Sequence, residues 1–422
     1  MLFETGHDFA RKADKEDPLR KFRHEFHFPR FGKQHAIYFA GNSLGLLSKQ
    51  VYPAIEQELK DWKQLAVSGY FKAKNPWLSY QRQFNKPLSE VMGCMESEVT
   101  VMNALTVNLH LLMLSFYRPT TQRYKIMMEA GAFPSDQYAV ETQVKFHGFL
   151  PEDAIIEVSA VAGEKTLRTE NILTAIDENR DTLAMVLFGG INYYTGQLFD
   201  MKTISDAAHK VGAIAGFDLA HVAGNVPVLL HDWNIDFAAW CSYKYLNAGP
   251  GAAGGIYIHE KYSGDTSFPR LGGWWGNEET TRFKMEKGFV PQPGAGGWQM
   301  STSQVFNMAA LTASLELITS AGMENLRNKS LQLTGYLEFL IRRLDINCEV
   351  ISPADPEQRG AQLSLFFKED ARKIHAEIIA KGVIADYREP GVIRIAPAPL
   401  YNSFDDVYRF YRILKKVSKR KN

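Results

Sequence analysis

Short apolar segments alternate with segments of helical periodicity from about residue 100 onward. The apolar segments include 124–128, 184–188, 213–217 and 255–258, and helix-like segments such as 169–180 and 201–211 lie between them. Alternation of this kind favours a mostly parallel, doubly wound sheet and therefore an α/β fold. We predict a sheet of seven strands in the larger part of the chain. An amphipathic helix over 51–66 precedes it.

The pattern changes beyond about residue 320 and predicts a smaller α+β domain. A long helical stretch over 303–344 leads into strands, a further helix and a closing helix; these segments are 348–352, 362–367, 371–381, 392–395 and the residues after 404. We divide the chain into an N-terminal segment (1–65) that packs with the small domain, a large domain (66–318) and the small domain (319–422). The Gly- and Trp-rich region 270–300 is too irregular for a buried element, and we expect a functional loop there.

Composition restricts the class of protein. Of 422 residues, 45% are hydrophobic and 23% charged, as in ordinary globular proteins. The net charge of +1 gives no field that would attract nucleic acid or a membrane. Residues 11–17 mix both charges, so no signal peptide is expected and a cytoplasmic enzyme is predicted. The three cysteines are unclustered, which predicts neither disulfides nor a metal site.

Lys244 and Asp218 each follow an apolar segment, 236–240 and 213–217 respectively. In a parallel sheet both side chains would face one crevice at the carboxyl ends of the strands. Pyridoxal phosphate needs such a pair, a lysine for the Schiff base and a carboxylate for the pyridinium nitrogen. On the pair alone, a surface lysine and a helix-capping aspartate would be the simpler interpretation.

Four neighbouring features favour the cofactor. His221 lies three residues after Asp218, and Thr106 begins an apolar helix whose N-terminus could hold a phosphate. Phe133 follows the strand at 124–128 and could stack on a planar ring. Tyr243 could reach a phosphate or transfer a proton. Each has an ordinary structural interpretation, so only their convergence carries weight. Residues 249–254 fit G-x-G-x-x-G, but they lead into a strand rather than a helix. We therefore reject a dinucleotide site and expect these glycines to let the backbone pass close to a cofactor or a neighbouring subunit.

Long motifs, in order along most of the chain, resemble those of the kynureninase family, which belongs to the fold-type-I pyridoxal-phosphate enzymes (aminotransferase class V superfamily). They are 38–45, 133–136, 194–197, 216–221, 231–233, 241–249, 281–285 and 393–403. The resemblance implies hydrolysis of L-kynurenine or its 3-hydroxy form to an anthranilate and L-alanine, in tryptophan catabolism and NAD biosynthesis. It also implies a homodimer with active sites at the subunit interface.

The resemblance assigns roles to individual residues. Lys244, Tyr243 and Asp218 are the expected catalytic residues, with Lys244 as the Schiff-base lysine and Tyr243 as a proton shuttle. The cofactor contacts it implies are Leu105, Thr106, Phe133, Ser135, Asp136, Asp218, His221, Tyr243 and Lys244, with Trp274 and Thr302 from the partner subunit. Arg394 is the expected clamp of the substrate carboxylate, and Asn42, Ser43 and Tyr70 complete the substrate site; no metal is expected.

Two departures from the family pattern bear on function. Gly189 stands where members tend to carry Ser or Thr near the cofactor. Loop 68–74 lacks a histidine that members preferring the hydroxylated substrate carry, and Thr302 stands where those members have Asn. The missing histidine and Thr302 together point toward plain L-kynurenine.

Alternatives remain at this stage. A cysteine desulfurase would need a cysteine on a mobile loop, and Cys94, Cys241 and Cys348 do not fit that requirement. A class V aminotransferase would need a 2-oxo acid as second substrate. A regulatory module that binds the cofactor without turnover would show no product, and no DNA-binding segment supports it.

Overall fold

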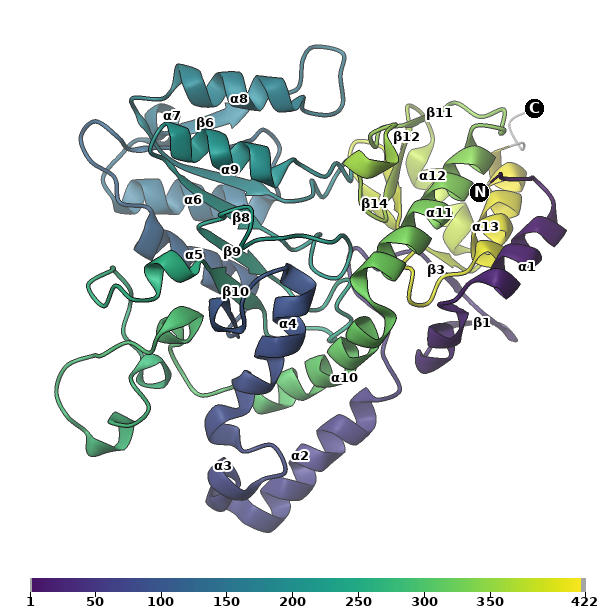
Figure 1. Ribbon diagram of the computed structural model, residues 1–422. Coiled ribbons are helices and arrows are strands. Elements are labelled where there is room, and N and C mark those ends of the chain that lie inside the picture. Colours follow the sequence, from purple (N-terminus) through teal and green to yellow (C-terminus); the bar gives the residue numbers. More distant parts are fainter. Residues whose placement is uncertain (1, 419–422) are drawn as a thin grey trace.

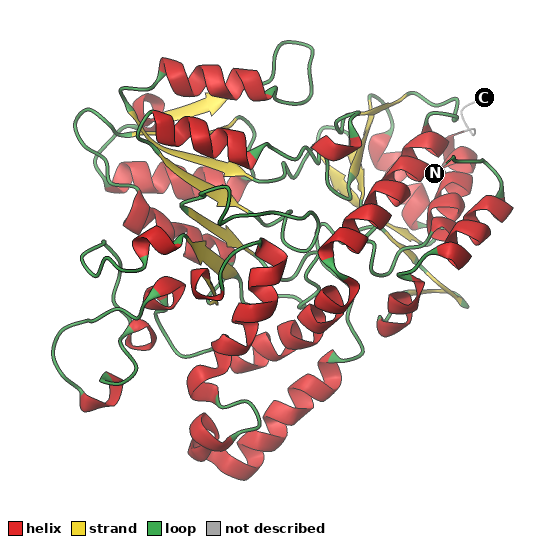
Figure 2. Cartoon of the chain, in the orientation of Figure 1, coloured by secondary structure: helices red, strands yellow, loops and turns green. Residues whose placement is uncertain are grey.

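The computed structural model describes residues 2–418, which form a large lobe and a small lobe (Figures 1 and 2). The large lobe contains one seven-stranded sheet. Its order is β4 (Val99–Val101), β10 (Gly255–Ile258), β9 (Phe237–Trp240), β8 (Ile214–Asp218), β7 (Leu183–Gly189), β5 (Lys125–Glu129) and β6 (Ile155–Val158). All neighbours pair in parallel except β10, which is antiparallel to both β4 and β9. The predicted α/β class and mostly parallel seven-stranded sheet are confirmed.

Helices cover both faces of this sheet, which explains why its strands are apolar on both sides. On β5, Ile126 and Met128 belong to one core with α5 (Leu105–Phe116) and α6 (Pro134–Phe146). The residue between them, Met127, belongs to the opposite core with α8 (Thr169–Glu178) and α9 (Met201–Lys210). Alternate residues of the strand therefore pack into alternate layers.

Strand ends differ from prediction by one residue where the chemistry lies. β8 and β5 end on Asp218 and Glu129, so both carboxylates belong to their strands rather than to the following loops. Both side chains are buried. At the carboxyl edge of the sheet, these two acids therefore end the two strands on either side of β7.

The small lobe is built on a four-stranded antiparallel sheet in the order β11 (Cys348–Val350), β12 (Leu363–Phe367), β15 (Val392–Ile395) and β14 (Asp386–Arg388). Its helices are α11 (Met323–Ile341), α12 (Ala371–Ile379) and α13 (Phe404–Ser418). The N-terminal helix α1 (His7–Glu16) packs on α13, where Asp14 accepts hydrogen bonds from the backbone N–H groups of Phe404 and Asp405. The first and last helices of the described chain, α1 and α13, both lie in this lobe (Figure 1).

The predicted helical stretch over 303–344 is confirmed, but it is divided into two helices. α10 (Val305–Ala321) and α11 are separate helices that bend by 79° between them. Gly322 takes a φ of +78° at the junction, a conformation that ends α10 and that L-residues with a side chain avoid. The bend directs α10 along the large lobe, where α2 (Val51–Leu65) packs on it.

The remaining elements are short. They are β1 (Arg30–Phe31), β2 (Gln34–His35), β3 (Ile37–Tyr38), α3 (Gly69–Lys72), α4 (Asn85–Met92), α7 (Pro151–Ala154) and β13 (Val383–Ile384). β3 pairs with β13 and α1 packs on α13, so these two N-terminal elements contact the small lobe, while α2 packs on α10. The domain limits at 65 and 318 stay a prediction. Across residues 2–418 no single helix is long and apolar enough to cross a membrane; only α10 and α11 taken together pass that test.

Candidate active site

A cavity of about 180 Å³ opens at the carboxyl ends of β5, β7 and β8. Nine of the predicted cofactor residues line it: Leu105, Thr106, Phe133, Ser135, Asp136, Asp218, His221, Tyr243 and Lys244. They come from the end of β8, the first turns of α5 and α6, and the turns after β8 and β9. The sheet therefore gathers residues that are up to 139 positions apart, from 105 to 244.

Lys244 lies in the turn that follows β9. The carbonyl of Tyr243 accepts a hydrogen bond from Gly45 N (2.8 Å) and that of Lys244 accepts one from Asn247 N (2.9 Å), which fixes the turn. The ammonium Nζ lies 5.9 Å from the ring centroid of Phe133 and 6.0 Å from that of Tyr243. The lysine side chain thus lies near two aromatic rings at the carboxyl ends of the strands.

Three buried carboxyl groups share the cavity floor. Burial raises the pKa of Glu129 to about 8. Burial and the nearby charge of Asp218 raise the pKa of Asp136 well above its usual range, and the two aspartates share a hydrogen bond. Burial also raises the pKa of Asp218, but the charge of Lys244 and the N–H of Ala220 (2.7 Å) oppose that shift. We infer that Asp218 carries the charge that Lys244 balances and that Asp136 is protonated.

His221 and Tyr243 are held in their neutral forms. Burial, with the charges of Lys244 and Arg394, lowers the pKa of His221 well below its usual value. Burial raises the pKa of the Tyr243 phenol, which therefore keeps its proton at neutral pH. A neutral phenol beside Lys244 is a proton donor and a neutral imidazole beside Asp218 adds no charge.

The two helix N-termini face the same cavity. Thr106 Oγ1 in the first turn of α5 lies 2.7 Å from Ser135 Oγ in the first turn of α6. The first N–H groups of a helix lack intrahelical partners and favour anions. Gly254, which directly precedes β10, lets the backbone pass close to the end of β9 and the start of α5. A Cβ at this position would lie 2.5 Å from the Trp240 carbonyl oxygen and 3.5 Å from Leu105 N. The expected approach of segment 249–254 to a cofactor or a neighbouring subunit stays a prediction.

Arg394 projects from β15 of the small lobe toward the large lobe. Its Nη1 donates to the carbonyl of Tyr193 (2.8 Å), and its Nη2 donates to Ser43 Oγ (3.0 Å) and pairs with Asp386. The ring of Tyr193 packs edge-on against Phe133 at 5.2 Å. The arginine is therefore linked to the Lys244 cavity through Tyr193. Asn42 is buried beside it and donates to Gln362 Oε1 (2.7 Å).

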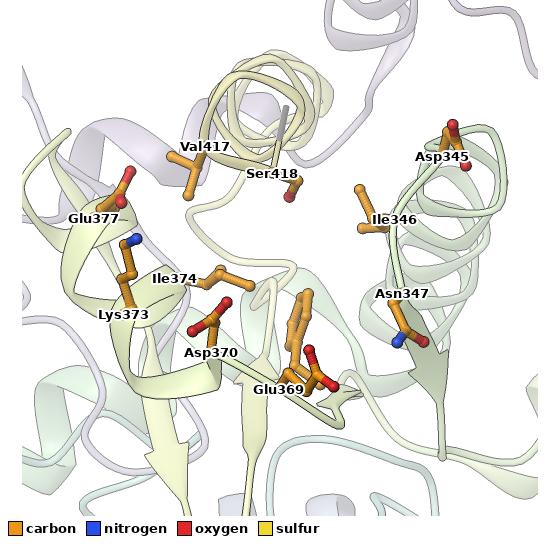
Figure 3. A pocket seen from close by; sticks show the side chains of 11 residues that line it. Asp345, Ile346, Asn347, Glu369, Asp370, Lys373, Ile374, Glu377, Val417 and Ser418 are labelled. Carbon is orange, nitrogen blue, oxygen red and sulfur yellow. The ribbon is translucent and has the colours of Figure 1, made fainter. Parts of the chain in front are cut away.

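The other predicted residues lie elsewhere in the chain. Tyr70, Trp274 and Thr302 line a separate, mostly apolar cavity of about 470 Å³, with Val67, Phe71, Leu78, Trp275, Phe283, Met300 and Ser301. Trp274 is 47% exposed. A third cavity, in the small lobe between α12, α13 and the turn before β11 (Figure 3), contains none of the predicted residues.

Sequence reasoning missed three residues at the site: Glu129, Tyr193 and Asp386. Glu129 ends an apolar strand in the same way as Asp218, and that position was the signal that could have identified it. Tyr193 directly precedes the family motif 194–197. Asp386 carried no signal, because its role comes from pairing across the sheet with Arg394.

The cysteines do not form a reactive site. Cys241 is buried, and burial raises the pKa of all three thiols, that of Cys348 to about 12. A thiol that stays protonated is a poor nucleophile. The desulfurase alternative therefore lacks its acceptor.

This sheet, with a lysine facing a buried aspartate at its carboxyl edge, defines a fold-type-I pyridoxal-phosphate-dependent enzyme. The fold is similar to that of a cysteine desulfurase from Thermococcus onnurineus (TM-score 0.76, 16% identity, 99% of this chain and 100% of that one). It is equally similar to a cysteine desulfurase from Escherichia coli (TM-score 0.76, 16% identity, 95% and 98%).

Sequence comparisons define the family more narrowly. Residues 326–414 match the model of the kynureninase C-terminal domain. Kynureninase of Flavobacterium psychrophilum is 51% identical over 99% of both chains. Kynureninase of Myxococcus xanthus is 52% identical over 98% of both, and that of Nematostella vectensis 47% identical over 98% of this chain and 94% of its own. The chain belongs to the kynureninase family.

Proposed function

We propose that this protein is a pyridoxal-phosphate-dependent hydrolase that cleaves the Cβ–Cγ bond of L-kynurenine, giving anthranilate and L-alanine. One observation carries the proposal: Lys244 faces buried Asp218 in the cavity of a chain about half identical, over its whole length, to kynureninases. Its proposed place is tryptophan catabolism and NAD biosynthesis, in the cytoplasm.

The residues present fit the cofactor. Asp136 Oδ1 is buried and has no hydrogen-bond partner within the described chain, so the cavity floor has an unused polar atom. Asp218 would hold the pyridinium nitrogen, Phe133 the ring face, and Leu105, Thr106, Ser135 and Tyr243 the phosphate. The cofactor, when bound, supplies an electron sink for negative charge on the substrate's carbons.

The chain's own groups supply binding and proton transfer. Lys244, whose amine would be free once the substrate is bound, would remove the α-proton. One water would supply the hydroxyl that ends in the carboxylate of anthranilate, and the β-carbon would take up a proton. Tyr243 Oη, kept protonated by burial, donates to the substrate carbonyl or the β-carbon. General acid–base help of this kind is worth about 10²–10⁴-fold. Arg394 would bind the substrate carboxylate in a bidentate manner, supported by Asn42 and Ser43.

Completion of the site requires a second copy of the chain. Trp274, Thr302 and Tyr70 do not line the Lys244 cavity of their own subunit. We assign Trp274 and Thr302 to the partner's phosphate site and Tyr70 to the substrate site, in a homodimer.

Lys244→Ala tests the proposal. We expect loss of the cofactor imine absorbance and of anthranilate release, while Tyr243→Phe keeps the absorbance but turns over about 10²–10⁴-fold more slowly. Absorbance near the imine band and anthranilate fluorescence measure the two effects. Kynurenine is supplied without any 2-oxo acid, so turnover also excludes an aminotransferase. Lys261→Ala, a lysine paired with Asp236 at the other end of the sheet, is the control. Normal turnover in Lys244→Ala would refute the assignment.

The substrate preference is a separate prediction. Because loop 68–74 carries no histidine and residue 302 is Thr, we expect a higher kcat/KM for L-kynurenine than for its 3-hydroxy form. Steady-state kinetics with both substrates measure the ratio. A ratio that favours the hydroxylated substrate would contradict the prediction without affecting the reaction type.

A further inference from the structure

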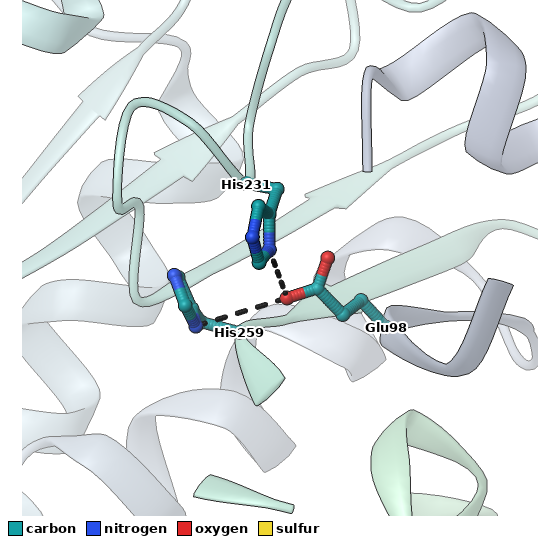
Figure 4. A group of neighbouring side chains, drawn as sticks. All are labelled: Glu98, His231 and His259. Carbon is teal, nitrogen blue, oxygen red and sulfur yellow. Dashed lines mark hydrogen bonds and ion pairs between the residues drawn. The ribbon is translucent and has the colours of Figure 1, made fainter. Parts of the chain in front are cut away.

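Three residues far apart in sequence converge at the end of the sheet opposite the Lys244 cavity (Figure 4). Glu98 directly precedes β4, His259 directly follows β10, and His231 lies in the loop before β9. β4 runs from Glu98 at this end toward Leu105 and the cofactor cavity at the other end. The cluster is therefore separate from the active site.

The three side chains point at a common centre. Glu98 Oε1 lies 3.0 Å from His231 Nδ1 and 3.7 Å from His259 Nδ1, and all three ligand atoms lie within 4.8 Å of one another. Zinc–ligand bonds of about 2.0–2.1 Å at tetrahedral angles place neighbouring ligand atoms about 3.3 Å apart. The observed separations bracket that value, so an ion needs only small side-chain movements.

The charge balance also favours a cation. The Glu98 side chain is 0% exposed, and within residues 2–418 no lysine or arginine forms an ion pair with it. Its oxygens accept hydrogen bonds from Met95 N (2.9 Å) and Glu260 N (2.8 Å), which fix the carboxylate. A fixed, fully buried carboxylate is costly unless a positive charge balances it.

A similar pair elsewhere lacks the second imidazole. His209 Nε2 lies 2.7 Å from Asp236 Oδ2, but the ammonium of Lys261 lies 2.6 Å from Asp236 Oδ1 and balances the charge. At Glu98 the corresponding place is taken by a second histidine. The carboxylate of Asp236 is therefore balanced by a lysine, whereas the carboxylate of Glu98 has a second imidazole in that place, which can serve as a metal ligand.

We propose that Glu98, His231 and His259 bind one divalent transition-metal ion of the zinc class, with water as fourth ligand. Two imidazoles and one carboxylate are a ligand set that zinc uses with an open position. The side chain of His231 is 31% exposed and gives the ion a path from solvent. Bound there, the ion displaces the proton between His231 and Glu98 and joins three segments of the fold. We therefore assign it a stabilising rather than a catalytic role.

Cobalt binding to the cofactor-loaded enzyme tests the proposal. We expect one Co²⁺ per chain, with the visible d–d absorption of a tetrahedral site, and a higher unfolding temperature when Zn²⁺ is added. His231→Asn should weaken Co²⁺ binding by more than about tenfold and remove the thermal shift. His209→Asn, the matched control, should change neither.

Kynurenine turnover without added metal should be unchanged in His231→Asn, because the cluster lies at the opposite end of the sheet. That measurement also shows that the variant folds. No Co²⁺ binding by the unaltered enzyme would overturn the proposal, as would binding that survives in both His231→Asn and Glu98→Gln.

Discussion

Glu129 shows how one residue's environment changes its chemistry. It ends β5 on the cavity floor, where both carboxylate oxygens accept from Gly189 N at 3.2–3.3 Å. A Cβ at Gly189 would lie 3.0 Å from Glu129 Oε1. The glycine that departs from the family pattern therefore leaves room for this acid. Because burial raises the pKa of Glu129 to about 8, it is a protonated acid at neutral pH.

The raised pKa of Glu129 predicts a pH dependence of stability. The folded state holds a proton between pH 4.5 and about 8 that the unfolded chain releases. The contribution of Glu129 is therefore complete below pH 4.5 and is lost as the pH rises through 8, by at most about 1.4 kcal/mol per pH unit. Glu129→Gln in the cofactor-free protein should remove this loss. Urea unfolding from pH 5 to 8 measures the difference, and parallel curves for both proteins would contradict it.

At the scale of elements, the contact between β10 and the start of α5 fixes the proposed phosphate site. Gly254 N donates to the carbonyl of Asn103 (2.7 Å), two residues before α5 begins at Leu105. Asn103 itself takes a φ of +47°. The N-terminus of α5 is thus positioned by a neighbouring strand rather than by its own capping side chain.

Gly254→Ala tests this contact. Its Cβ would lie 2.5 Å from the Trp240 carbonyl oxygen, so we expect a loss of about 1–3 kcal/mol in the free energy of unfolding. Displacement of Leu105 N should also weaken cofactor binding. Gly264→Ala meets nothing within 4 Å and is the control. Urea unfolding and cofactor titration measure both effects; equal behaviour of the two variants would disprove the role of the contact.

At the scale of the whole molecule, the chain exposes apolar side chains beside the cavity that contains Trp274. Val67 is 76% exposed, Phe71 62%, Phe283 54% and Met285 78%. Exposed apolar patches of this kind mark protein–protein interfaces. These exposed side chains lie beside Trp274, which does not line the Lys244 cavity of its own chain. We therefore expect the partner subunit of the proposed homodimer to cover them.

Mixing two variants tests the shared site. A Lys244→Ala chain lacks the lysine, and a Trp274→Ala chain should bind cofactor weakly. A mixed dimer pairs the intact Lys244 of one chain with the intact Trp274 of the other. At limiting cofactor, activity after subunit exchange should exceed the sum of the two variants measured separately. Activity that merely adds, with light scattering showing monomers, would refute the shared site.

The sequence by itself determined the strand–helix alternation, the positions of Lys244 and Asp218 after apolar strands, and the family motifs. These are local properties, because periodicity and strand-end position are written in neighbouring residues. The helical stretch over 303–344 is also a local property, although its break at Gly322 was not predicted.

Only the tertiary structure decided which distant groups meet. It pairs Arg394 of β15 with Asp386 of β14, and it buries Glu129, which raises the pKa of that carboxyl group. It also places Trp274 in a different cavity from Lys244. It also joined Glu98, His231 and His259 into one cluster. Burial, and contacts between side chains of separate strands and loops, depend on packing of the whole chain, and no local pattern contains them.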